Sequence, residues 1–168
     1  MSRVVQHVFT AIRPQNSERL IPVFDTEHPI GSSGDMRPWY TRRACSHTAK
    51  SQINLCVYDS TWEATEAFRL DKSDLVEAWV KNDHLGFEIF YFWNGSVRRY
   101  RPDFLVKLTN STTLVVEVKG QDSPEQQAKR KALDEWVRAV NSDGRFGRWA
   151  WDIARQPGDV SAILVKHG

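Results

Sequence analysis

Apolar and polar positions alternate with the period of a strand or a helix over most of the chain after residue 50. Residues 53–57 alternate apolar and polar side chains, which is the pattern of a short strand. Ser60 opens the sequence Ser-Thr-Trp-Glu, a capping box that predicts the start of a helix. A second helical stretch is predicted over 73–81, where four apolar side chains recur at helical spacing.

The middle of the chain predicts a β-hairpin followed by another strand. Residues 87–93 are rich in aromatic and β-branched side chains, and the dipeptide at 94–95 is Asn-Gly, the strongest short hairpin signal. The return strand is predicted to begin at Val97 and to run through Pro102 to Val106. After a polar turn, residues 114–119 form the next predicted strand.

The last third of the chain predicts a helix and a further strand. Residues 123–126 read Ser-Pro-Glu-Gln, a second capping box with proline in the first helical position, and this helix is expected to reach about Asn141. Residues 148–154 predict a strand, whereas 160–166 fit either a strand or a short helix. The step from 114 to 154 is long enough for a parallel crossover. The predicted fold class is therefore α/β, with a mixed central β-sheet flanked by helices.

The first fifty residues have a different pattern. They contain four prolines and the run Gly-Ser-Ser-Gly at 31–34, which disfavour long helices. We predict a short strand or helix over 4–12 within an extended connector segment at 1–50, followed by one domain at 51–168. Because a stand-alone protein rarely begins with so much connecting chain, we expect the whole chain to be the C-terminal part of a longer protein.

Composition narrows the class of protein. At 168 residues, with 40% hydrophobic and 26% charged side chains, the chain is long enough to bury a core. No apolar run approaches the roughly 20 residues that a membrane span needs. The two cysteines are too few for a disulfide framework, and their spacing fits no zinc motif. The net charge of +2 does not by itself indicate nucleic-acid binding. We therefore expect a cytoplasmic protein without a membrane partner.

The candidate chemistry lies on two neighbouring strands. Asp103 directly follows Pro102, and Glu117 and Lys119 are two residues apart, so these two side chains point to the same face of their strand. Charges are costly on a sheet face that a helix covers, and carboxylates with an amine beside them suit Mg²⁺, which prefers oxygen ligands. Lys119 would orient or deprotonate an attacking water, or neutralise developing charge. The alternative interpretation is an Asp103–Lys119 ion pair on an exposed sheet face.

These residues resemble the signature of the PD-(D/E)XK nuclease superfamily, in which Pro-Asp is followed at a distance by Glu-x-Lys. Here thirteen residues separate Asp103 from Glu117. The longer strings resemble the C-terminal endonuclease domain of the Res subunits of type III restriction enzymes, over roughly residues 51–155. The strings that carry this resemblance are 99–106 (Arg-Tyr-Arg-Pro-Asp-Phe-Leu-Val), 114–120 (Leu-Val-Val-Glu-Val-Lys-Gly) and 136–141 (Trp-Val-Arg-Ala-Val-Asn).

The resemblance implies a restriction-endonuclease-like PD-(D/E)XK core that hydrolyses DNA phosphodiester bonds with Mg²⁺, for which Mn²⁺ can substitute. The expected partners are double-stranded DNA, a helicase or translocase domain or subunit, and a methyltransferase subunit. Because the chain contains no Walker A glycine–lysine loop, it is not itself the ATP-driven motor. On this comparison it is the C-terminal cleavage module of a type III-like restriction enzyme.

The resemblance also implies roles for individual residues. Asp103 and Glu117 would be metal ligands, with the Val118 carbonyl as a further ligand, and Lys119 would be the catalytic amine. The superfamily often adds a glutamate from the first core helix, for which Glu63 fits best and Glu66 is second; Glu63 also fits a purely structural role in its capping box. Some relatives use a glutamine or lysine on the helix after the third strand, here Gln121, Gln126 or Lys129. The candidate DNA contacts are Arg99, Arg101, Gln121 and Lys129, each of which also fits a solvated surface position.

Two other functions remain open from the sequence. The domain can keep this fold and act as a catalytically silent DNA-binding or assembly module. It can also be an RNA-processing nuclease, because the site chemistry does not read the 2′-hydroxyl.

Overall fold

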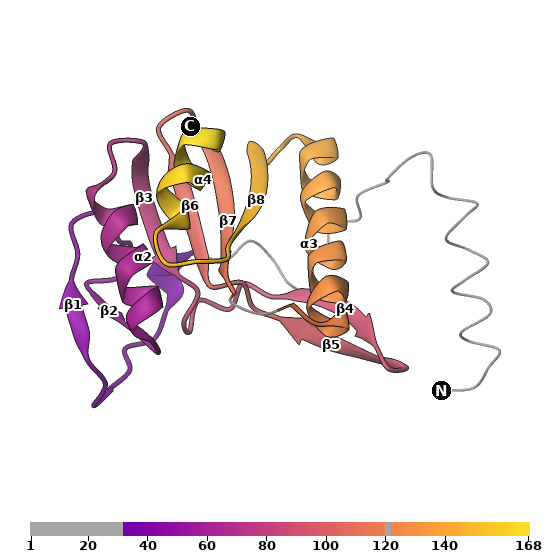
Figure 1. Ribbon diagram of the computed structural model, residues 1–168, viewed down its shortest axis with the longest axis horizontal. Coiled ribbons are helices and arrows are strands. Elements are labelled where there is room, and N and C mark those ends of the chain that lie inside the picture. Colours follow the sequence, from indigo (N-terminus) through magenta and orange to yellow (C-terminus); the bar gives the residue numbers. More distant parts are fainter. Residues whose placement is uncertain (1–31, 120–121) are drawn as a thin grey trace.

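The computed structural model describes residues 32–119 and 122–168. Within these ranges it contains three α-helices, one four-stranded sheet and two separate two-stranded sheets (Figure 1). The strand or helix predicted at 4–12 lies outside the described residues, as does Gln121. The elements are the 3₁₀ turn η1 (Ser33–Asp35), β1 (Cys45–His47), β2 (Leu55–Val57), α2 (Thr61–Lys72), β3 (Val76–Lys81), β4 (Ile89–Trp93), β5 (Ser96–Tyr100), β6 (Phe104–Leu108), β7 (Thr112–Val118), α3 (Pro124–Asp143), β8 (Arg148–Ala154) and α4 (Asp159–His167).

The central sheet is mixed, as predicted. Its strand order is β3-β6-β7-β8, in which β3 pairs with β6 and β6 with β7 in antiparallel register, whereas β7 and β8 are parallel. The parallel pair is joined through α3, so the predicted crossover is confirmed. The mixed α/β class is therefore confirmed.

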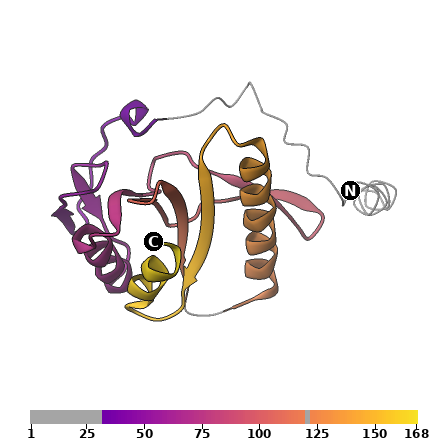
Figure 2. The same cartoon turned by 90° about the horizontal axis from the view of Figure 1, so that it is seen from above.

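Helices cover both faces of this sheet (Figure 2). Phe104, Val106 and Val116 belong to a buried cluster that includes side chains of α2 and α4. Leu105 and Val115 point to the opposite face, in a cluster with side chains of α3 and of the β4–β5 hairpin. This alternation follows from the two-residue period of a strand. Glu117, near the end of β7, shares its face with Val115 and is likewise buried.

Both predicted capping boxes start helices. The Ser60 hydroxyl accepts a hydrogen bond from the Glu63 N–H at 3.1 Å, and the Ser123 hydroxyl accepts one from the Gln126 N–H at 3.2 Å. Helix α3 ends at Asp143 and is followed by Gly144, whose φ of 75° is the left-handed conformation that glycine adopts without strain. The C-terminal segment, for which strand and helix were both open, is the helix α4.

The prediction of a helix over 73–81 is wrong. Helix α2 ends at Lys72, Ser73 is extended, and 76–81 form strand β3 beside β6. A short apolar run satisfies both periods, and here the strand buries Val76, Trp79 and Val80 against the sheet and helices. Tertiary pairing with β6 thus decided the structure of a segment whose local pattern was ambiguous.

The prediction of one continuous strand from Val97 to Val106 is also wrong. The Asn-Gly turn is confirmed, with φ of 47° and 78° at Asn94 and Gly95. However, β5 ends at Tyr100, β6 begins at Phe104, and the β4–β5 hairpin forms a sheet of its own below α3 (Figure 1). Proline at 102 has no N–H for a ladder, which is consistent with a break between the two strands.

Residues 45–50 of the predicted connector contact the rest of the structure. Strand β1 pairs antiparallel with β2, and the buried Asp71 carboxylate accepts hydrogen bonds from the N–H groups of Ala49 and Lys50. The same carboxylate accepts a bond from the Trp79 indole at 3.1 Å. Burial alone would raise the pKa of Asp71, but these hydrogen bonds hold it below its ordinary value.

We expect Asp71→Ala to lower the free energy of unfolding by roughly 2 kcal/mol, because it leaves the buried Trp79 indole and the N–H groups of Ala49 and Lys50 without their acceptor. Urea unfolding followed by tryptophan fluorescence measures this loss. Asp74→Ala, at an exposed position two residues past the end of α2, is the control and should change stability by less than about 0.5 kcal/mol. Equal stability of the two variants would contradict the role given to Asp71.

Candidate active site

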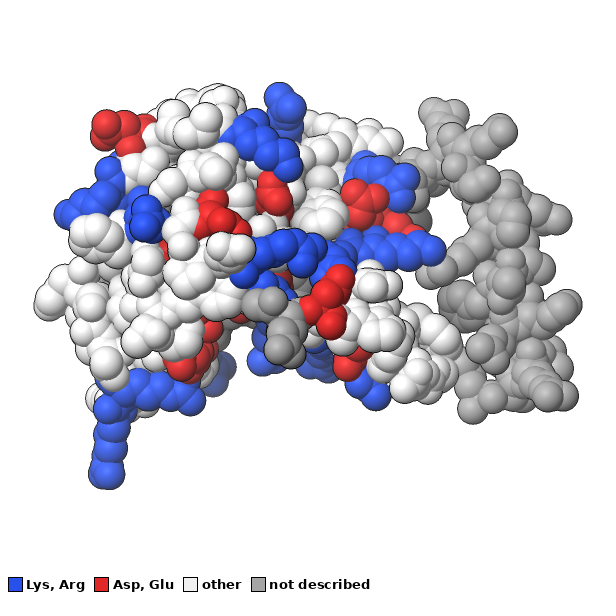
Figure 3. Space-filling model, in the orientation of Figure 1, with Lys and Arg blue, Asp and Glu red and all other residues white. Residues whose placement is uncertain are grey.

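Several elements begin or end together at one edge of the central sheet. Strand β3 ends at Lys81, which pairs with Phe104 at the start of β6, and β7 ends at Val118 on the other side of β6. In Figure 3 the surface is hollowed below these strand ends, between the part built on α2 and the part built on α3, and both acidic and basic side chains line the hollow. We call this region the site edge.

Asp103 and Glu117 meet at the site edge. The antiparallel β6–β7 ladder ends at the pair Phe104–Val116, and Asp103 and Glu117 are the next residues of the two chains at that end. The charge of Asp103 raises the pKa of Glu117. Asp103 Oδ2 accepts a hydrogen bond from the Val118 N–H at 2.7 Å. Glu117 Oε2 accepts one from the Tyr100 hydroxyl at 2.6 Å. Residues 103 and 117 are thus brought together.

The second oxygen of each carboxylate is available. Within 32–119 and 122–168, neither Asp103 Oδ1 nor Glu117 Oε1 takes part in a hydrogen bond. These two oxygens are also not buried. In the described ranges, the side-chain atoms that are both buried and without a hydrogen-bond partner are Glu66 Oε2 and Asn82 Oδ1. The two free oxygens at the site edge are therefore open to water or to an ion.

Burial and neighbouring negative charges perturb the pKa values of both carboxyls. The pKa of Asp103 is raised to about 6, chiefly by burial and then by the charge of Glu63, while the hydrogen bond from Val118 acts in the opposite direction. Burial and the charge of Asp103 raise the pKa of Glu117 to about 7, although the Tyr100 hydrogen bond acts in the opposite direction. Two carboxylates that resist ionising together form a site that a cation would stabilise.

Lys119 follows directly after β7 and is partly buried. Its backbone N–H donates to the Ala154 carbonyl at 2.8 Å, which extends the β7–β8 ladder by one residue. Its positive charge lowers the pKa of both Asp103 and Glu117. Within the described ranges the Lys119 amine forms no ion pair with Asp103 or any other acid, so the interpretation as an Asp103–Lys119 surface ion pair is not supported.

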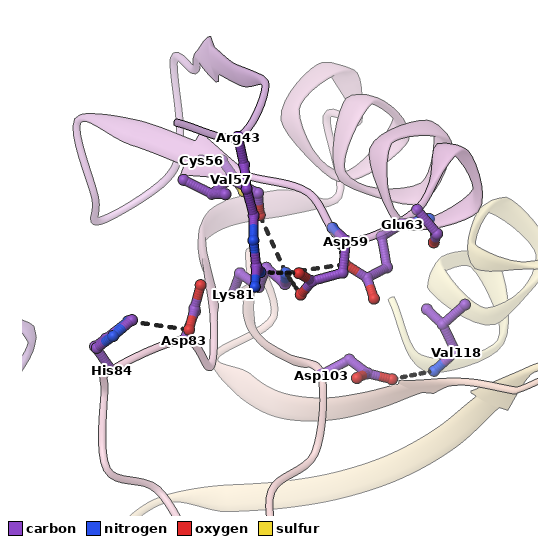
Figure 4. A network of polar contacts seen from close by, with 11 residues as sticks. Arg43, Cys56, Val57, Asp59, Glu63, Lys81, Asp83, His84, Asp103 and Val118 are labelled. Atoms are coloured by element: carbon purple, nitrogen blue, oxygen red, sulfur yellow. Dashed lines mark hydrogen bonds and ion pairs between the residues drawn. The ribbon is translucent and has the colours of Figure 1, made fainter. Parts of the chain in front are cut away.

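Glu63 reaches the same edge from the first turn of α2 (Figure 4). Its Oε2 accepts a hydrogen bond from the Asp59 N–H at 3.1 Å and forms an ion pair with the Lys81 amine at 2.9 Å. Its charge raises the pKa of Asp103, which shows that the two carboxyls are close in electrostatic terms. Glu63 is thus both a helix-start residue and a member of the acidic group around Asp103.

Glu66 is directed elsewhere. It is fully buried, and its Oε1 accepts hydrogen bonds from the Trp62 indole at 3.0 Å and from the Gly158 N–H at 2.5 Å. Gly158 is the residue that precedes α4 and has no side chain to cap that helix. Glu66 therefore joins α2 to the start of α4, and of the two candidate glutamates Glu63 is the one associated with Asp103.

Lys81 is a charged residue of the site edge that the sequence patterns did not single out. Only 6% of it is exposed, and its amine donates to the Val57 carbonyl at 3.1 Å, to Asp59 Oδ2 at 2.6 Å and to Glu63 Oε2 at 2.9 Å (Figure 4). Burial alone would lower the pKa of Lys81, but the bonds to these two acids outweigh it and raise that pKa. In the sequence, Lys81 is the last residue of an apolar run that was predicted to be helical. Because 76–81 form a strand instead, Lys81 lies at the end of β3 and is buried at the site edge.

The candidate DNA contacts are divided by the structure. Arg99 and Arg101 both form ion pairs with Glu88 across the hairpin, at 3.5 and 2.5 Å, so their charges are partly neutralised. Lys129 on α3 has no acidic partner within the described ranges and lies over the rings of Tyr91 and Tyr100, 5.8 Å from each centroid. Its charge lowers the pKa of Glu117, so Lys129 faces the site edge. Gln126 lies in the first turn of α3, where its N–H serves the Ser123 cap.

The residues present fit a hard divalent cation with few protein ligands. Mg²⁺ keeps several waters and needs only one or two carboxylates, which Asp103 and Glu117 supply, and the Val118 carbonyl follows Glu117 in the chain. Within the described ranges no three side chains of the types His, Cys, Asp and Glu gather into a denser cation cage.

Comparison with family models, with curated proteins and with solved structures returned no match for this chain. In the part of the chain that the structure describes, every helix is too short or too polar to cross a membrane.

We expect Glu117→Gln to stabilise the protein in EDTA at pH 8. The folded-state pKa of Glu117 is raised from 4.5 to about 7, so its proton favours folding below pH 4.5 and this contribution is lost as the pH rises to 7. Glutamine keeps the Tyr100 bond without the charge, and the gain should be roughly 2 kcal/mol at pH 8 and near zero at pH 4.5. Thermal unfolding at both pH values measures it. Glu77→Gln, on the exposed side of β3, is the control, and a destabilised Glu117→Gln protein at pH 8 contradicts the prediction.

Lys81→Met should lower the free energy of unfolding by about 3 kcal/mol, because it leaves Asp59 and Glu63 facing each other without the buried amine. Denaturant unfolding measures the loss. Lys166→Met is the matched control, since Lys166 is 66% exposed in its ion pair with Asp152 and should contribute less than about 1 kcal/mol. Adding Glu63→Gln to Lys81→Met should recover part of the loss, and its failure to do so would argue against the coupling of these two charges.

Proposed function

We propose that this chain is a Mg²⁺-dependent endonuclease domain that hydrolyses phosphodiester bonds of DNA. The observation that carries the proposal is that Asp103 and Glu117 lie at the same end of the β6–β7 ladder, each with one oxygen held by a hydrogen bond and one oxygen free. The Lys119 amine, two residues along the same strand face, completes the arrangement. The sequence signature Pro-Asp…Glu-x-Lys supports the same proposal.

In this proposal Asp103, Glu117 and the Val118 carbonyl hold the cation. When bound, Mg²⁺ polarises the phosphodiester and lowers the pKa of a bound water, so that a nucleophile is available at neutral pH. The raised pKa values of the two acids mean that the empty site tends to retain protons, and that cation binding is opposed by protons below about pH 7.

The chain's own side chains then act on the substrate. Lys119, whose amine has no acidic partner in the described ranges, orients the attacking water or neutralises charge that grows on the phosphoryl oxygens. Glu63 adds a third negative charge near Asp103, and its ion pair with Lys81 holds the Glu63 carboxylate in place. Lys129, on the opposite wall, is available to a phosphate of the bound strand.

DNA is proposed to be delivered by other parts of a larger enzyme. The net charge is only +2, and the hairpin arginines already have acidic partners, whereas affinity for DNA comes mainly from neutralised phosphates. The resemblance to Res endonuclease domains supports a role as the C-terminal cleavage module of a type III-like restriction enzyme. A helicase or translocase and a methyltransferase subunit would then bring the duplex to the hollow at the site edge.

Asp103→Ala and Lys119→Ala should each reduce the rate of plasmid nicking in Mg²⁺ by about a hundredfold or more, because each removes a group that acts on the reacting phosphate. Supercoiled plasmid conversion on agarose gels measures the rate. Lys107→Ala is the matched control for a strand lysine, since Lys107 lies on β6 away from the site edge and bonds the Ser111 carbonyl. Undiminished nicking in both site variants would refute the assignment.

The same assay separates the other two functions. A catalytically silent DNA-binding or assembly module would give no nicking and no stabilisation by Mg²⁺ or Mn²⁺ in thermal unfolding. An RNA-processing nuclease would cut a labelled RNA faster than the DNA of the same sequence.

A further inference from the structure

The β4–β5 hairpin supplies a contact to the site edge although it shares no ladder with the central sheet. Tyr100, the last residue of β5, is 4% exposed, and its hydroxyl donates to Glu117 Oε2 at 2.6 Å. Three residues later in the chain, Asp103 accepts the Val118 N–H. A segment of four residues therefore bonds two consecutive residues at the end of β7.

The tyrosine is rigidly placed. Tyr100 pairs with Ile89 across the hairpin, and its ring packs in the buried cluster with Val115, Leu133 and Val137. A tyrosine side chain has only two torsions, so a packed ring fixes the direction of the hydroxyl. Glu117 by contrast has three torsions, and its backbone alone does not decide where its two oxygens point.

We infer that Tyr100 is a positioning residue that orients the Glu117 carboxylate for a divalent cation. By holding Oε2, the hydroxyl directs Oε1 to the side of Asp103. Partners that orient a ligand in this way commonly change metal affinity by about 10–100-fold when they are removed. This inference rests on the proposed function, because it needs a cation between Asp103 and Glu117.

The hairpin contains its own matched control. Tyr91 lies on the same inner face, is 6% exposed, and donates its hydroxyl at 2.6 Å to Glu125 in the first turn of α3. Tyr91→Phe and Tyr100→Phe each remove one hydroxyl from a buried ring and one hydrogen bond to a glutamate. A merely structural role for both tyrosines predicts similar effects on stability and none on cation binding.

The experiment compares the full chain, Tyr100→Phe and Tyr91→Phe, with thermal unfolding first confirming that all three fold. Mn²⁺ binding is measured without DNA by the loss of the free-ion signal in electron paramagnetic resonance. We expect Tyr100→Phe to weaken Mn²⁺ binding about tenfold or more and Tyr91→Phe to leave it within about twofold. In plasmid nicking under saturating Mg²⁺, kcat of Tyr100→Phe should fall by about tenfold while KM for DNA stays within about twofold.

The outcomes separate the two proposals. If the unaltered chain binds Mn²⁺ and Tyr100→Phe binds it equally well, the positioning role is overturned while the cation site stands. If Tyr91→Phe weakens Mn²⁺ binding as much as Tyr100→Phe, the role is likewise overturned, because the effect then comes from the hairpin in general. If the unaltered chain binds no Mn²⁺, the positioning role and the proposed nuclease function fall together.

Discussion

The antiparallel register between β6 and β7 is the constraint on which the site depends. Pairing Phe104 with Val116 places Asp103 and Glu117 at the same end of the ladder and brings the Val118 N–H to the Asp103 carboxylate. A shift of one residue would turn every side chain of one strand to the other face. Because Phe104 and Val116 are fully buried against α2 and α4, the core itself holds the register, and the packing of the interior fixes the geometry of the acids.

The site edge collects more charge than a sheet normally carries beneath its helices. Positive charges act on these acids: the Lys81 amine forms ion pairs with Asp59 and Glu63, and the charges of Lys119 and Lys129 oppose the rise in the pKa of Glu117. Even so, the pKa values of Asp103 and Glu117 stay raised, chiefly because both carboxyls are buried, and secondly because the charge of Glu63 acts on Asp103 and that of Asp103 acts on Glu117. Carboxyls whose pKa values are perturbed by burial and by a neighbouring charge are typical of functional sites.

Local signals in the sequence predicted much of this arrangement, and non-local pairing accounts for what they missed. The two capping boxes, the Asn94-Gly95 turn and the spacing of Asp103 from Glu117 each depend on a few neighbouring residues. Strand β3 was missed because its apolar run also fits a helix, and with it the buried amine of Lys81. The bond from Tyr100 to Glu117 was not foreseeable either, since it requires knowing that the hairpin packs under α3 and leaves the main sheet.

The separateness of that hairpin has a consequence for how the chain tolerates change. The β4–β5 hairpin forms no ladder hydrogen bonds with the four-stranded sheet, so a change in the hairpin turn leaves the pairing of that sheet intact. The tip at Asn94-Gly95 is exposed, and a Cβ on Gly95 would meet no neighbouring atom. Insertions, epitope tags or fluorescent labels introduced there would extend into solvent while the other end of the hairpin, at Tyr100, stays anchored by its buried ring.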